Sequence, residues 1–359
     1  MKPILSAAVK NVKNRIKGLK QKHIGKFKAK LEYRDFESRL KLLEPKGFLL
    51  VSGAMRSGTT LIGECLYSRF NNHQRHEDIC FANDNVLLIR ELSNYLRKNI
   101  SPSILITDPN NRIPFDKKGV SSFCGLSKKS NHLFFKYLLL KKIQENSPSK
   151  VNPIISGIKT TQLLGEYYLI KEFFDDVKFI IMMRDPRDVY SSCFLRTMRI
   201  TSNKDEAKIL SLMNTLTQVN SYNFYKKNQA DTNIKIVRYE DLVMNTEEKI
   251  QEILSFIGVD ADKYDWESLN SVSSSNSSYQ DREITIGSGV SKESIGKYKC
   301  TLSPQDISTI EHLAQKIILD LEYDTLSSLS PKRNIDSIDL DRVRYTAEKY
   351  GVSFDGFQT

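Results

Sequence analysis

A buried strand that runs into a glycine-bearing turn and then a helix constrains the fold of this chain more than any other feature. Residues 48–52 are expected to form the strand, residues 53–60 have the sequence Gly-Ala-Met-Arg-Ser-Gly-Thr-Thr, and a helix is expected from about 59 to 70. In this context the glycines let backbone N–H groups turn inward, and the first turn of the helix adds partial positive charge. The sequence therefore predicts a loop that binds an anion.

The cation of this loop stands in a different place from that of the nucleotide triphosphatases. Those proteins carry a lysine directly after the second glycine of G-x-x-x-x-G-K-[ST], whereas Thr59 takes that position here. The cation of the loop is Arg56, two residues before Gly58. The pattern argues against ordinary hydrolysis of ATP or GTP, although an ATP-dependent P-loop phosphotransferase stays open as an alternative.

Strands and helices alternate along the rest of the chain. Further strands are expected at 153–157, 177–183 and 233–237, and helices at 131–144, 163–174, 186 onward, 204–227 and 303–321. Residues 267–289 are rich in Ser, Asn and Gly and are expected to form an exposed loop. Alternation of this kind predicts an α/β fold in which a mostly parallel central sheet is flanked by helices.

A second polar motif follows the strand at 177–183. Arg184 comes directly after the strand, and Asp185 can cap a helix whose first residue is Pro186. Ser192 lies on that helix. From the residues alone this motif is either a second anion-binding element or a well-capped surface helix whose charges are solvated.

Together the two motifs resemble those of the PAPS-dependent sulfotransferases, which move a sulfuryl group from 3′-phosphoadenosine 5′-phosphosulfate (PAPS) to a hydroxyl group. The family's 5′-phosphosulfate loop, [K/R]-[ST]-G-T-T, is matched by Arg56, Ser57, Gly58, Thr59 and Thr60. In that family an Arg at a strand end and a Ser eight positions later bind the 3′-phosphate, and Arg184 and Ser192 have this spacing. Two such motifs suit a ligand with two phosphate groups, because open parallel sheets bind ligands at the carboxyl ends of their strands.

The resemblance runs from about Gly47 to Tyr323 and implies the P-loop-like sulfotransferase fold. The Arg in the loop makes the chain similar to the tyrosylprotein-type and bacterial sulfotransferases. It implies a nucleotide-binding transferase for which PAPS is the co-substrate and no metal is needed. The acceptor of sulfation is a hydroxyl-bearing molecule whose class stays open between carbohydrate, lipid, small alcohol and protein tyrosine.

Three further segments resemble the family more loosely. Tyr239 begins a Y-E-D-L segment in which the family's Tyr approaches the nucleotide, although a packing tyrosine is an equal alternative. Lys297 lies in a segment like S-x-x-[K/R]-W, whose cation reaches the 3′-phosphate, but Tyr298 replaces the Trp. Lys159 lies in a G-x-K-[ST] segment, and its alternative is a solvated lysine at a strand end.

The resemblance also implies roles in the chemistry. Arg56 and Lys159 would offset negative charge on the group in transfer. The tyrosylprotein-type enzymes place a catalytic Glu shortly after the first helix, and Glu77 stands at the matching position as the general base. His76 competes for this role because imidazole titrates near neutral pH, Asp78 is the weaker third candidate, and a solvated loop of mixed charge is the remaining alternative.

The positive charge of the chain is concentrated at its start. Ten of the eleven net positive charges lie within residues 1–31, which contain no acid. An apolar stripe at helical spacing predicts that residues 1–22 contact an anionic membrane, dock on their own domain or form a solvated arm. The remainder is nearly neutral, so nucleic acid is not expected as a partner. A non-catalytic membrane-surface protein that binds a nucleotide stays open as well.

Three parts are expected along the chain: a basic helical arm at 1–46, a sulfotransferase domain at 47–325, and a polar tail at 326–359 with a helix near 339–350. The five cysteines lie far apart, and the chain begins without a secretory signal pattern. A cytoplasmic protein is therefore expected, peripheral to a membrane if the arm binds one. The oligomeric state is left open.

Overall fold

The computed structural model describes residues 37–66, 79–83, 133–143, 155–272, 290–326 and 342–345, apart from a few positions within these ranges. The basic segment 1–31 and the loop with His76, Glu77 and Asp78 lie outside the described residues, so the predictions for them stay predictions. The chain divides into two compact units, residues 1–44 with 88–142 and residues 45–87 with 143–359. In the first unit the described side chains of Leu40, Leu139 and Leu140 are buried.

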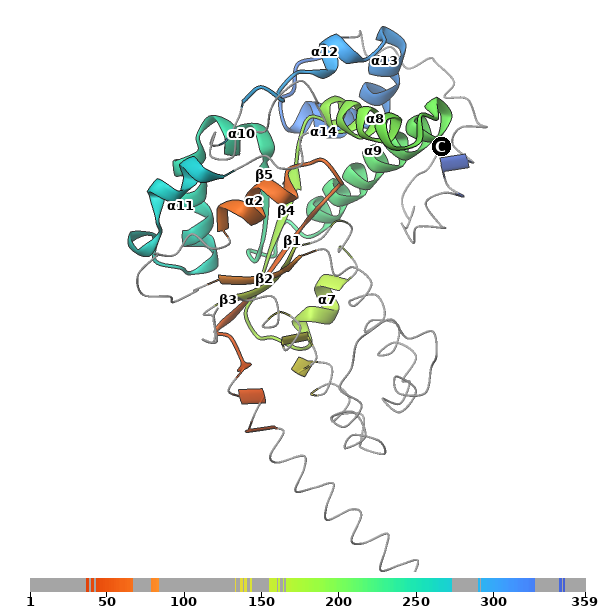
Figure 1. Cartoon of the computed structure of the whole chain (residues 1–359). Helices are drawn as coiled ribbons and strands as arrows, with labels where there is room; N and C mark the ends of the chain where they lie inside the picture. The colour runs from red at the N-terminus through yellow and green to blue at the C-terminus, as the bar shows by residue number, and fades with distance from the viewer. Residues whose placement is uncertain are drawn as a thin grey trace, which may run out of the picture. The chain divides into compact units, whose positions relative to one another are not determined.

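The second unit is built on a parallel sheet. Its described strands are β1 (Gly47–Gly53), β2 (Ile79–Asn83), β3 (Ile155–Lys159), β4 (Val177–Met183) and β5 (Ile234–Arg238), in the order β2-β3-β1-β4-β5 (Figure 1). Every described pairing is parallel. The predicted α/β class with a mostly parallel sheet is confirmed, and four of the strands lie within two residues of their predicted bounds. Strand β2 was not predicted.

Helices follow the strands in the order that the sequence suggested. They are α2 (Thr59–Leu66), α7 (Glu166–Lys171), α8 (Pro186–Thr201), α9 (Lys204–Lys227), α10 (Tyr239–Met244), α11 (Thr246–Ile257), α12 (Tyr298–Thr301), α13 (Pro304–Leu313) and α14 (Gln315–Asp320). Two short 3-10 helices, η1 (Ala261–Lys263) and η2 (Trp266–Ser271), follow α11. None of the described helices is both long enough and apolar enough to cross a membrane.

Two predicted elements need correction. The helix expected at 303–321 is divided at Ala314, which ends α13 and precedes α14. The loop expected at 267–289 is not wholly exposed, because η2 occupies its first residues and the side chains of Leu269 and Val272 are buried. Composition is a poor guide to burial in the second case, because a few apolar residues in a polar stretch can still reach the core.

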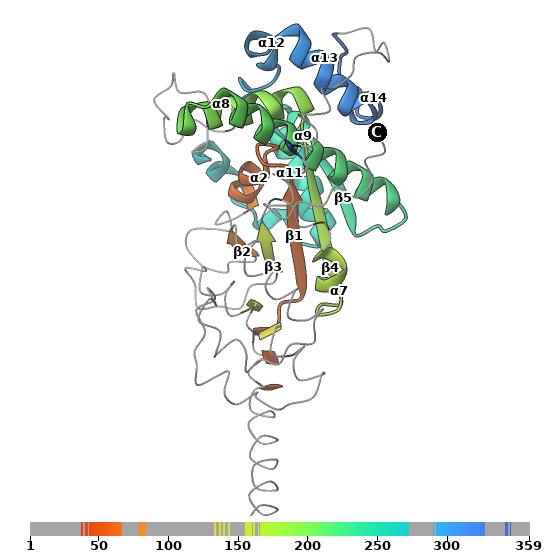
Figure 2. The same ribbon diagram turned by 90° about the vertical axis from the view of Figure 1, so that its right-hand side faces the viewer.

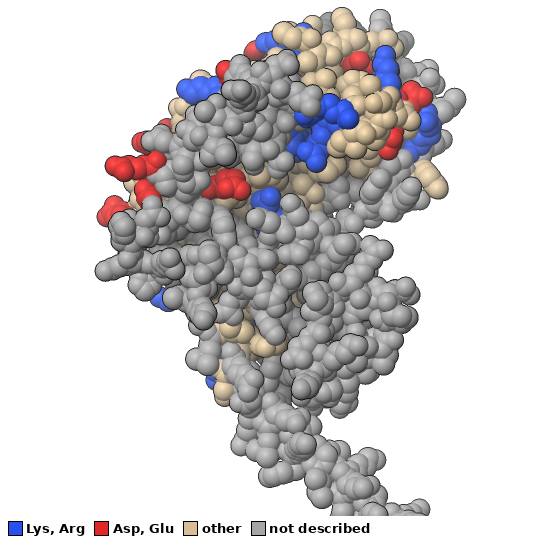
Figure 3. Space-filling model, viewed as in Figure 1, with Lys and Arg blue, Asp and Glu red and all other residues tan. Residues whose placement is uncertain are grey.

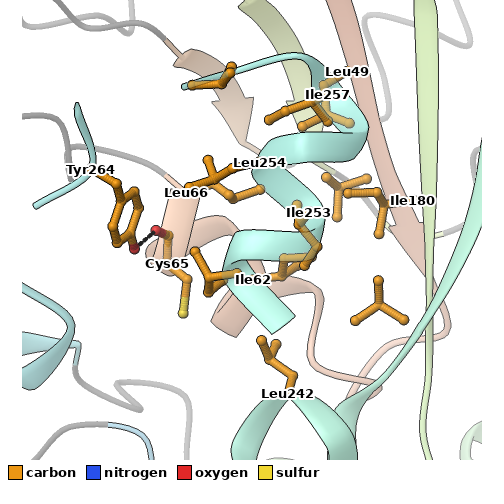
Figure 4. Packing of buried hydrophobic residues seen from close by; sticks show 14 of the residues in the cluster. Leu49, Ile62, Cys65, Leu66, Ile180, Leu242, Ile253, Leu254, Ile257 and Tyr264 are labelled. Carbon is orange, nitrogen blue, oxygen red and sulfur yellow. Dashed lines mark hydrogen bonds between the residues drawn. The ribbon is translucent and has the colours of Figure 1, made fainter. Parts of the chain in front are cut away.

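One face of the sheet packs against α2 and α11. Alternate residues of β1 and β4, including Leu49 and Ile180, meet Ile62 of α2 and Leu254 of α11 in one hydrophobic cluster (Figure 4). On this face the hydroxyl of Tyr264 donates a hydrogen bond to the carbonyl of Cys65, the next-to-last residue of α2. The cluster fixes α2 against the sheet, and with it the loop that precedes α2.

The other face of the sheet packs against α7 and α9 through aromatic rings. The ring of Phe179 on β4 lies 5.2 Å from that of Tyr167 on α7 and 5.8 Å from that of Phe224 on α9, measured between centroids. Helix α8 and the helices from α12 to α14 lie beyond the carboxyl ends of the strands (Figure 2). This arrangement leaves the carboxyl edge of the sheet bordered by α2, α8 and the α12 segment.

Candidate functional site

The sequence motifs converge at the carboxyl edge of the sheet. The loop of residues 54–58 leaves β1, Lys159 ends β3, Arg184 follows β4, and Tyr239 follows β5. The chain leaves β1 toward β2 on one side and later passes from β3 to β4 on the other. In open α/β sheets such a reversal beside a strand marks the place where ligands bind.

The backbone of the loop after β1 has an unusual shape. Gly58 has φ +102°, and a Cβ there would lie 2.6 Å from Cδ2 of Tyr239, so a side chain would be both strained and obstructed. The hydroxyl of Ser57 donates to the carbonyl of Ala54 at 2.7 Å and closes the turn. Glycine at position 58 therefore has a physical reason, which is close approach of the loop to the ring of Tyr239.

Arg56 adopts a left-handed backbone conformation, with φ +71°. A non-glycine residue in this region costs about 1 kcal/mol or more, so surrounding contacts must hold it. The two carbonyls that flank its φ and ψ angles are both fixed: that of Met55 accepts from the amide of Asn214, and that of Arg56 accepts from Nη1 of Arg184 at 3.0 Å. Residues from α9 and from the end of β4 thus hold Arg56 in place.

The loop and the second polar motif meet directly. Nε of Arg56 donates to the hydroxyl of Ser192 on α8 at 3.0 Å. Burial and the positive charges of Arg184 and Arg196 lower the pKa of Arg56 to about 10. The charges of Arg184 and Arg196 act on Arg56, and three like charges close together favour a multiply charged anion.

Arg184 is buried and fixed by several neighbours. Its Nη2 donates to the carbonyl of Ser294 at 2.6 Å, and its own carbonyl accepts from the amide of Gln218 on α9. Its Nε is buried and has no hydrogen-bond partner among the described residues. A buried donor without a partner is costly, and an anionic ligand with oxygen acceptors would satisfy it. The unpartnered Nε of Arg184 therefore suits a phosphate group as its partner.

Tyr239 packs among the residues at the carboxyl edge of the sheet. It is only 9% exposed, and its ring lies under the guanidinium of Arg184. Its hydroxyl shares a hydrogen bond of 2.6 Å with that of Ser294. Tyr239 therefore packs against Arg184 and Gly58 and forms one wall of the candidate site.

Lys159 is also part of this edge. Its side chain is buried, with 5% exposed, and Nζ lies 3.4 Å from the hydroxyl of Thr60. A Cβ on Gly63 would lie 2.9 Å from Cδ of Lys159, so the glycine of α2 leaves room for the lysine. The alternative of a solvated lysine at a strand end is wrong. Thr59 and Thr60 begin α2, next to the loop.

The segment with Lys297 is fixed through its neighbours. Tyr298 is buried, and its ring lies 4.3 Å below the guanidinium carbon of Arg187. An aromatic ring at position 298 therefore serves packing. Lys297 itself is partly exposed.

The beginning of α8 is buried, which corrects the alternative of a solvated surface helix. Arg187 is 1% exposed and pairs with the carboxylates of Asp185 and Glu311. Asp185 also accepts from the backbone N–H of Arg187 and so caps the helix as predicted, with Pro186 in its first turn. The sequence did not indicate this burial, because four of the five residues at 184–188 are charged.

Asn214 and Gln218 were not predicted as residues of the site. Both are fully buried on α9, one turn apart, and both donate to backbone carbonyls of the site. The signal was present in part, since several buried polar residues of α9 interrupt its apolar face at helical spacing: Ser211, Asn214, Thr215, Thr217, Gln218 and Ser221. Their partners are distant in sequence, which no local pattern reveals.

Two observations bear on what the edge can bind. Figure 3 shows Lys and Arg side chains at several places on the described surface, the largest group lying in its upper part, with Asp and Glu side chains interspersed on the same face. The described residues contain no cluster of three His, Cys, Asp or Glu side chains that could hold a metal ion. Among the described residues of this edge, Arg56, Lys159 and Arg184 carry positive charge.

Most of the chain matches the model of a known protein family. The family model described as "Sulfotransferase domain" matches residues 47–322, which is more than half of the chain. No curated protein matches the chain.

Several solved structures are similar at low identity. The sulfotransferase domain of the Synechococcus PCC 7002 olefin synthase is 15% identical, with a TM-score of 0.43, and the match covers 78% of this chain and 96% of that one. Sulfotransferase STF9 from Mycobacterium avium is 12% identical, with a TM-score of 0.41 and coverage of 82% of each chain. Mouse sulfotransferase SULT7A1, complexed with PAP, is 11% identical, with a TM-score of 0.41 and coverage of 84% and 90%.

Proposed function

We propose that this chain, which belongs to the sulfotransferase domain family, transfers a sulfuryl group from PAPS to a hydroxyl group of its acceptor through the residues at the carboxyl edge of its sheet. Sulfotransfer itself follows from the family. The roles of individual residues and the nature of the acceptor are the proposal, and they are argued from the contacts of the site.

The contact that carries the proposal is the hydrogen bond from Arg56 to Ser192. It brings the 5′-phosphosulfate loop and the 3′-phosphate motif into contact across 136 residues of sequence. A nucleotide phosphorylated at both the 5′ and the 3′ positions needs two anion sites close together, and this contact supports the proposal that the two motifs form such a pair.

We assign the 5′ end of the nucleotide to the loop of residues 56–60. The N–H groups at the start of α2 point toward this loop, and a helix N-terminus favours an anion. The 3′-phosphate is assigned to Arg184, Ser192 and Lys297. The unpartnered Nε of Arg184 supports this, because a phosphate oxygen would complete its hydrogen bonding. Tyr239 would form the wall beneath.

When bound, PAPS supplies an activated sulfuryl group, so the protein needs no nucleophile of its own. Sulfuryl transfer depends on placement in line and on stabilisation of charge, as phosphoryl transfer does. Arg56 is part of the loop and donates to Ser192, and Nζ of Lys159 lies beside the hydroxyl of Thr60 at the end of the loop. We propose that both cations stabilise charge on the oxygens of the transferred group.

The general base is proposed to be Glu77, with His76 as the competitor. Both lie outside the described residues, between α2 and β2. The acceptor is proposed only as a molecule with a free hydroxyl, since a carbohydrate, a lipid, a small alcohol and a protein tyrosine all present this group. Screening cell extracts with ³⁵S-labelled PAPS would find it.

Calorimetry with two nucleotides tests the proposal. The full chain should bind adenosine 3′,5′-bisphosphate far more tightly than ATP, with or without Mg²⁺, because Arg184 and Ser192 require a 3′-phosphate. A preference for ATP with Mg²⁺ would instead support the phosphotransferase alternative. Binding of neither nucleotide would leave no basis for the residue roles assigned above.

A further inference from the structure

A buried carboxylate holds the backbone on both sides of Lys297. Asp188 is 0% exposed, and its two oxygens accept from different residues: Oδ2 from the N–H of Gly296 at 2.7 Å, and Oδ1 from the N–H of Tyr298 at 3.0 Å. Lys297 is the residue between these two donors. Gly296 has φ +72°, so the chain turns sharply at this point and the two N–H groups face one carboxylate.

The same segment is held at its other end by the nucleotide motifs. The carbonyl of Ser294 accepts from Nη2 of Arg184, and its hydroxyl shares a hydrogen bond with Tyr239. Asp188 and Ser192 lie four residues apart on α8, which places them on one face of the helix. Helix α8 therefore presents Asp188 to the segment that contains Lys297 and, one turn later, Ser192 to Arg56.

We infer that Asp188 is a positioning residue that holds Lys297 beside Arg184 and Ser192, and so determines how strongly the enzyme prefers a nucleotide with a 3′-phosphate. The inference rests on the proposed function, in which these three residues hold that phosphate. In this role Asp188 acts through the backbone, because each of its oxygens accepts from a backbone N–H group next to Lys297.

A carboxylate suits this task better than any similar side chain. Ionised, it only accepts hydrogen bonds, and it can serve two N–H donors at once. An Asn of the same shape would turn its own N–H₂ toward one of the two donors. The pKa of Asp188 is raised overall, because burial outweighs the charge of Arg184 and the two backbone hydrogen bonds, which lower it. The cost of burying an acid here is thus offset in part by the groups that it orders.

The test compares two nucleotides on the full chain and on Asp188→Asn. Adenosine 3′,5′-bisphosphate has the 3′-phosphate, and adenosine 5′-monophosphate lacks it. Loss of one hydrogen bond to a charged group predicts bisphosphate binding weaker by about tenfold to a hundredfold, with monophosphate binding changed less than about twofold. Asp262→Asn, the same change on an exposed side chain of η1, is the matched control and should leave both affinities unchanged.

A double mutant separates a positioning role from a structural one. If Asp188 acts through Lys297, then Asp188→Asn should add little to the loss caused by Lys297→Ala. Asp188→Glu keeps both acceptor oxygens on a longer side chain. It should fall between wild type and Asp188→Asn, and it serves the same comparison if the Asn variant does not fold.

Three results would overturn the inference: an unchanged preference for the bisphosphate in folded Asp188→Asn and Asp188→Glu, an equal loss of both nucleotides, or full additivity with Lys297→Ala. The wild-type chain reports on the proposed function separately. If the wild type binds the bisphosphate no better than the monophosphate, the proposed function fails. If it prefers the bisphosphate and both Asp188 variants keep that preference, only the inference fails.

Discussion

The guanidinium carbon of Arg184 lies 4.5 Å from the centroid of the Tyr239 ring, so the end of β4 and the start of α10 are joined by a cation–π contact. The pair forms a single unit, because Arg184 donates to the carbonyl of Ser294 and Tyr239 is hydrogen-bonded to the hydroxyl of the same residue. The orientation of Arg184 in the proposed 3′-phosphate site therefore depends on an aromatic ring.

Two substitutions of Tyr239 separate the ring from its hydroxyl. Tyr239→Phe keeps the ring and removes one hydrogen bond, worth about 1 kcal/mol, so bisphosphate binding should weaken by no more than about fivefold. Tyr239→Leu also removes the cation–π contact, worth about 0.5 to 2 kcal/mol, and should weaken binding further. Calorimetry measures both. Equal losses in the two variants would show that the hydroxyl alone matters.

Arg184→Ala should weaken binding of adenosine 3′,5′-bisphosphate tenfold or more, because charge-assisted hydrogen bonds are worth roughly 1.5 to 3 kcal/mol each. Arg184→Lys keeps the charge but loses the planar fork that reaches the carbonyls of Arg56 and Ser294, so its affinity should be intermediate. Near-UV circular dichroism checks the fold. Wild-type affinity in a folded Arg184→Ala chain would refute the assignment.

The charge of Arg56 should lower the stability of the free protein, although the proposed reaction needs that charge. Its pKa in the folded chain is about 10, below the ordinary value of 12.5, because it is buried among other arginines. The guanidinium proton of Arg56 is therefore bound more tightly in the unfolded chain than in the folded chain. Below pH 10 both states carry the charge, and the charge then lowers the free energy of unfolding. This cost disappears as the pH rises through about 10 and above, where the folded chain releases the proton first.

Arg56→Gln removes the charge and leaves a side chain that can still bond Ser192. At pH 7 the free energy of unfolding of the free protein should rise by about 1 to 3 kcal/mol, while sulfotransfer falls. Urea denaturation and an assay with ³⁵S-labelled PAPS measure the two quantities. Lys263→Gln, on an exposed side chain, is the matched control and should change neither. A less stable Arg56→Gln chain would contradict the argument from charge.

Much of this site could be predicted from sequence because its motifs are local. Each anion motif lies at one junction between a strand and the helix that follows it, so glycine, capping residues and apolar runs determine it together. The predicted bounds of β4 and α9 coincide with the observed ones, since a continuous apolar strand and a helix with clear ends leave little choice.

The rest depends on contacts between distant segments. Nothing near Asp188 in the sequence indicates Gly296 and Tyr298 as its partners, and nothing near Asn214 indicates Met55. A charged residue at a helix start is usually solvated, so burial of Asp188 follows only from the later segment that covers it. Local patterns predicted the candidate residues for binding the anion, and the structure was needed to find the residues that hold these candidates in place.

The basic arm is proposed to hold the enzyme near anionic membranes without taking part in the chemistry. Removing residues 1–22 should abolish binding to liposomes that contain anionic lipid and spare turnover of a soluble acceptor, because ten of the eleven net positive charges lie in 1–31. Sedimentation with liposomes measures the first quantity. A deletion variant that no longer folds would favour the alternative in which the arm docks on its own domain.

Glu77→Gln should lower kcat by about 10² to 10⁴, the usual contribution of a positioned general base, while binding of adenosine 3′,5′-bisphosphate stays unchanged. The two readouts separate proton transfer from nucleotide binding, because the proposed nucleotide contacts come from other residues. His76→Ala is the matched variant one position away, and it tests the competing base in the same assay. The pH profile gives an independent sign: an imidazole base would make kcat fall as the pH drops below about 6.5, whereas an unperturbed carboxylate would keep kcat until about pH 4. If Glu77→Gln keeps full turnover and His76→Ala does not, the base is His76, and the similarity to the tyrosylprotein-type enzymes does not extend to proton transfer.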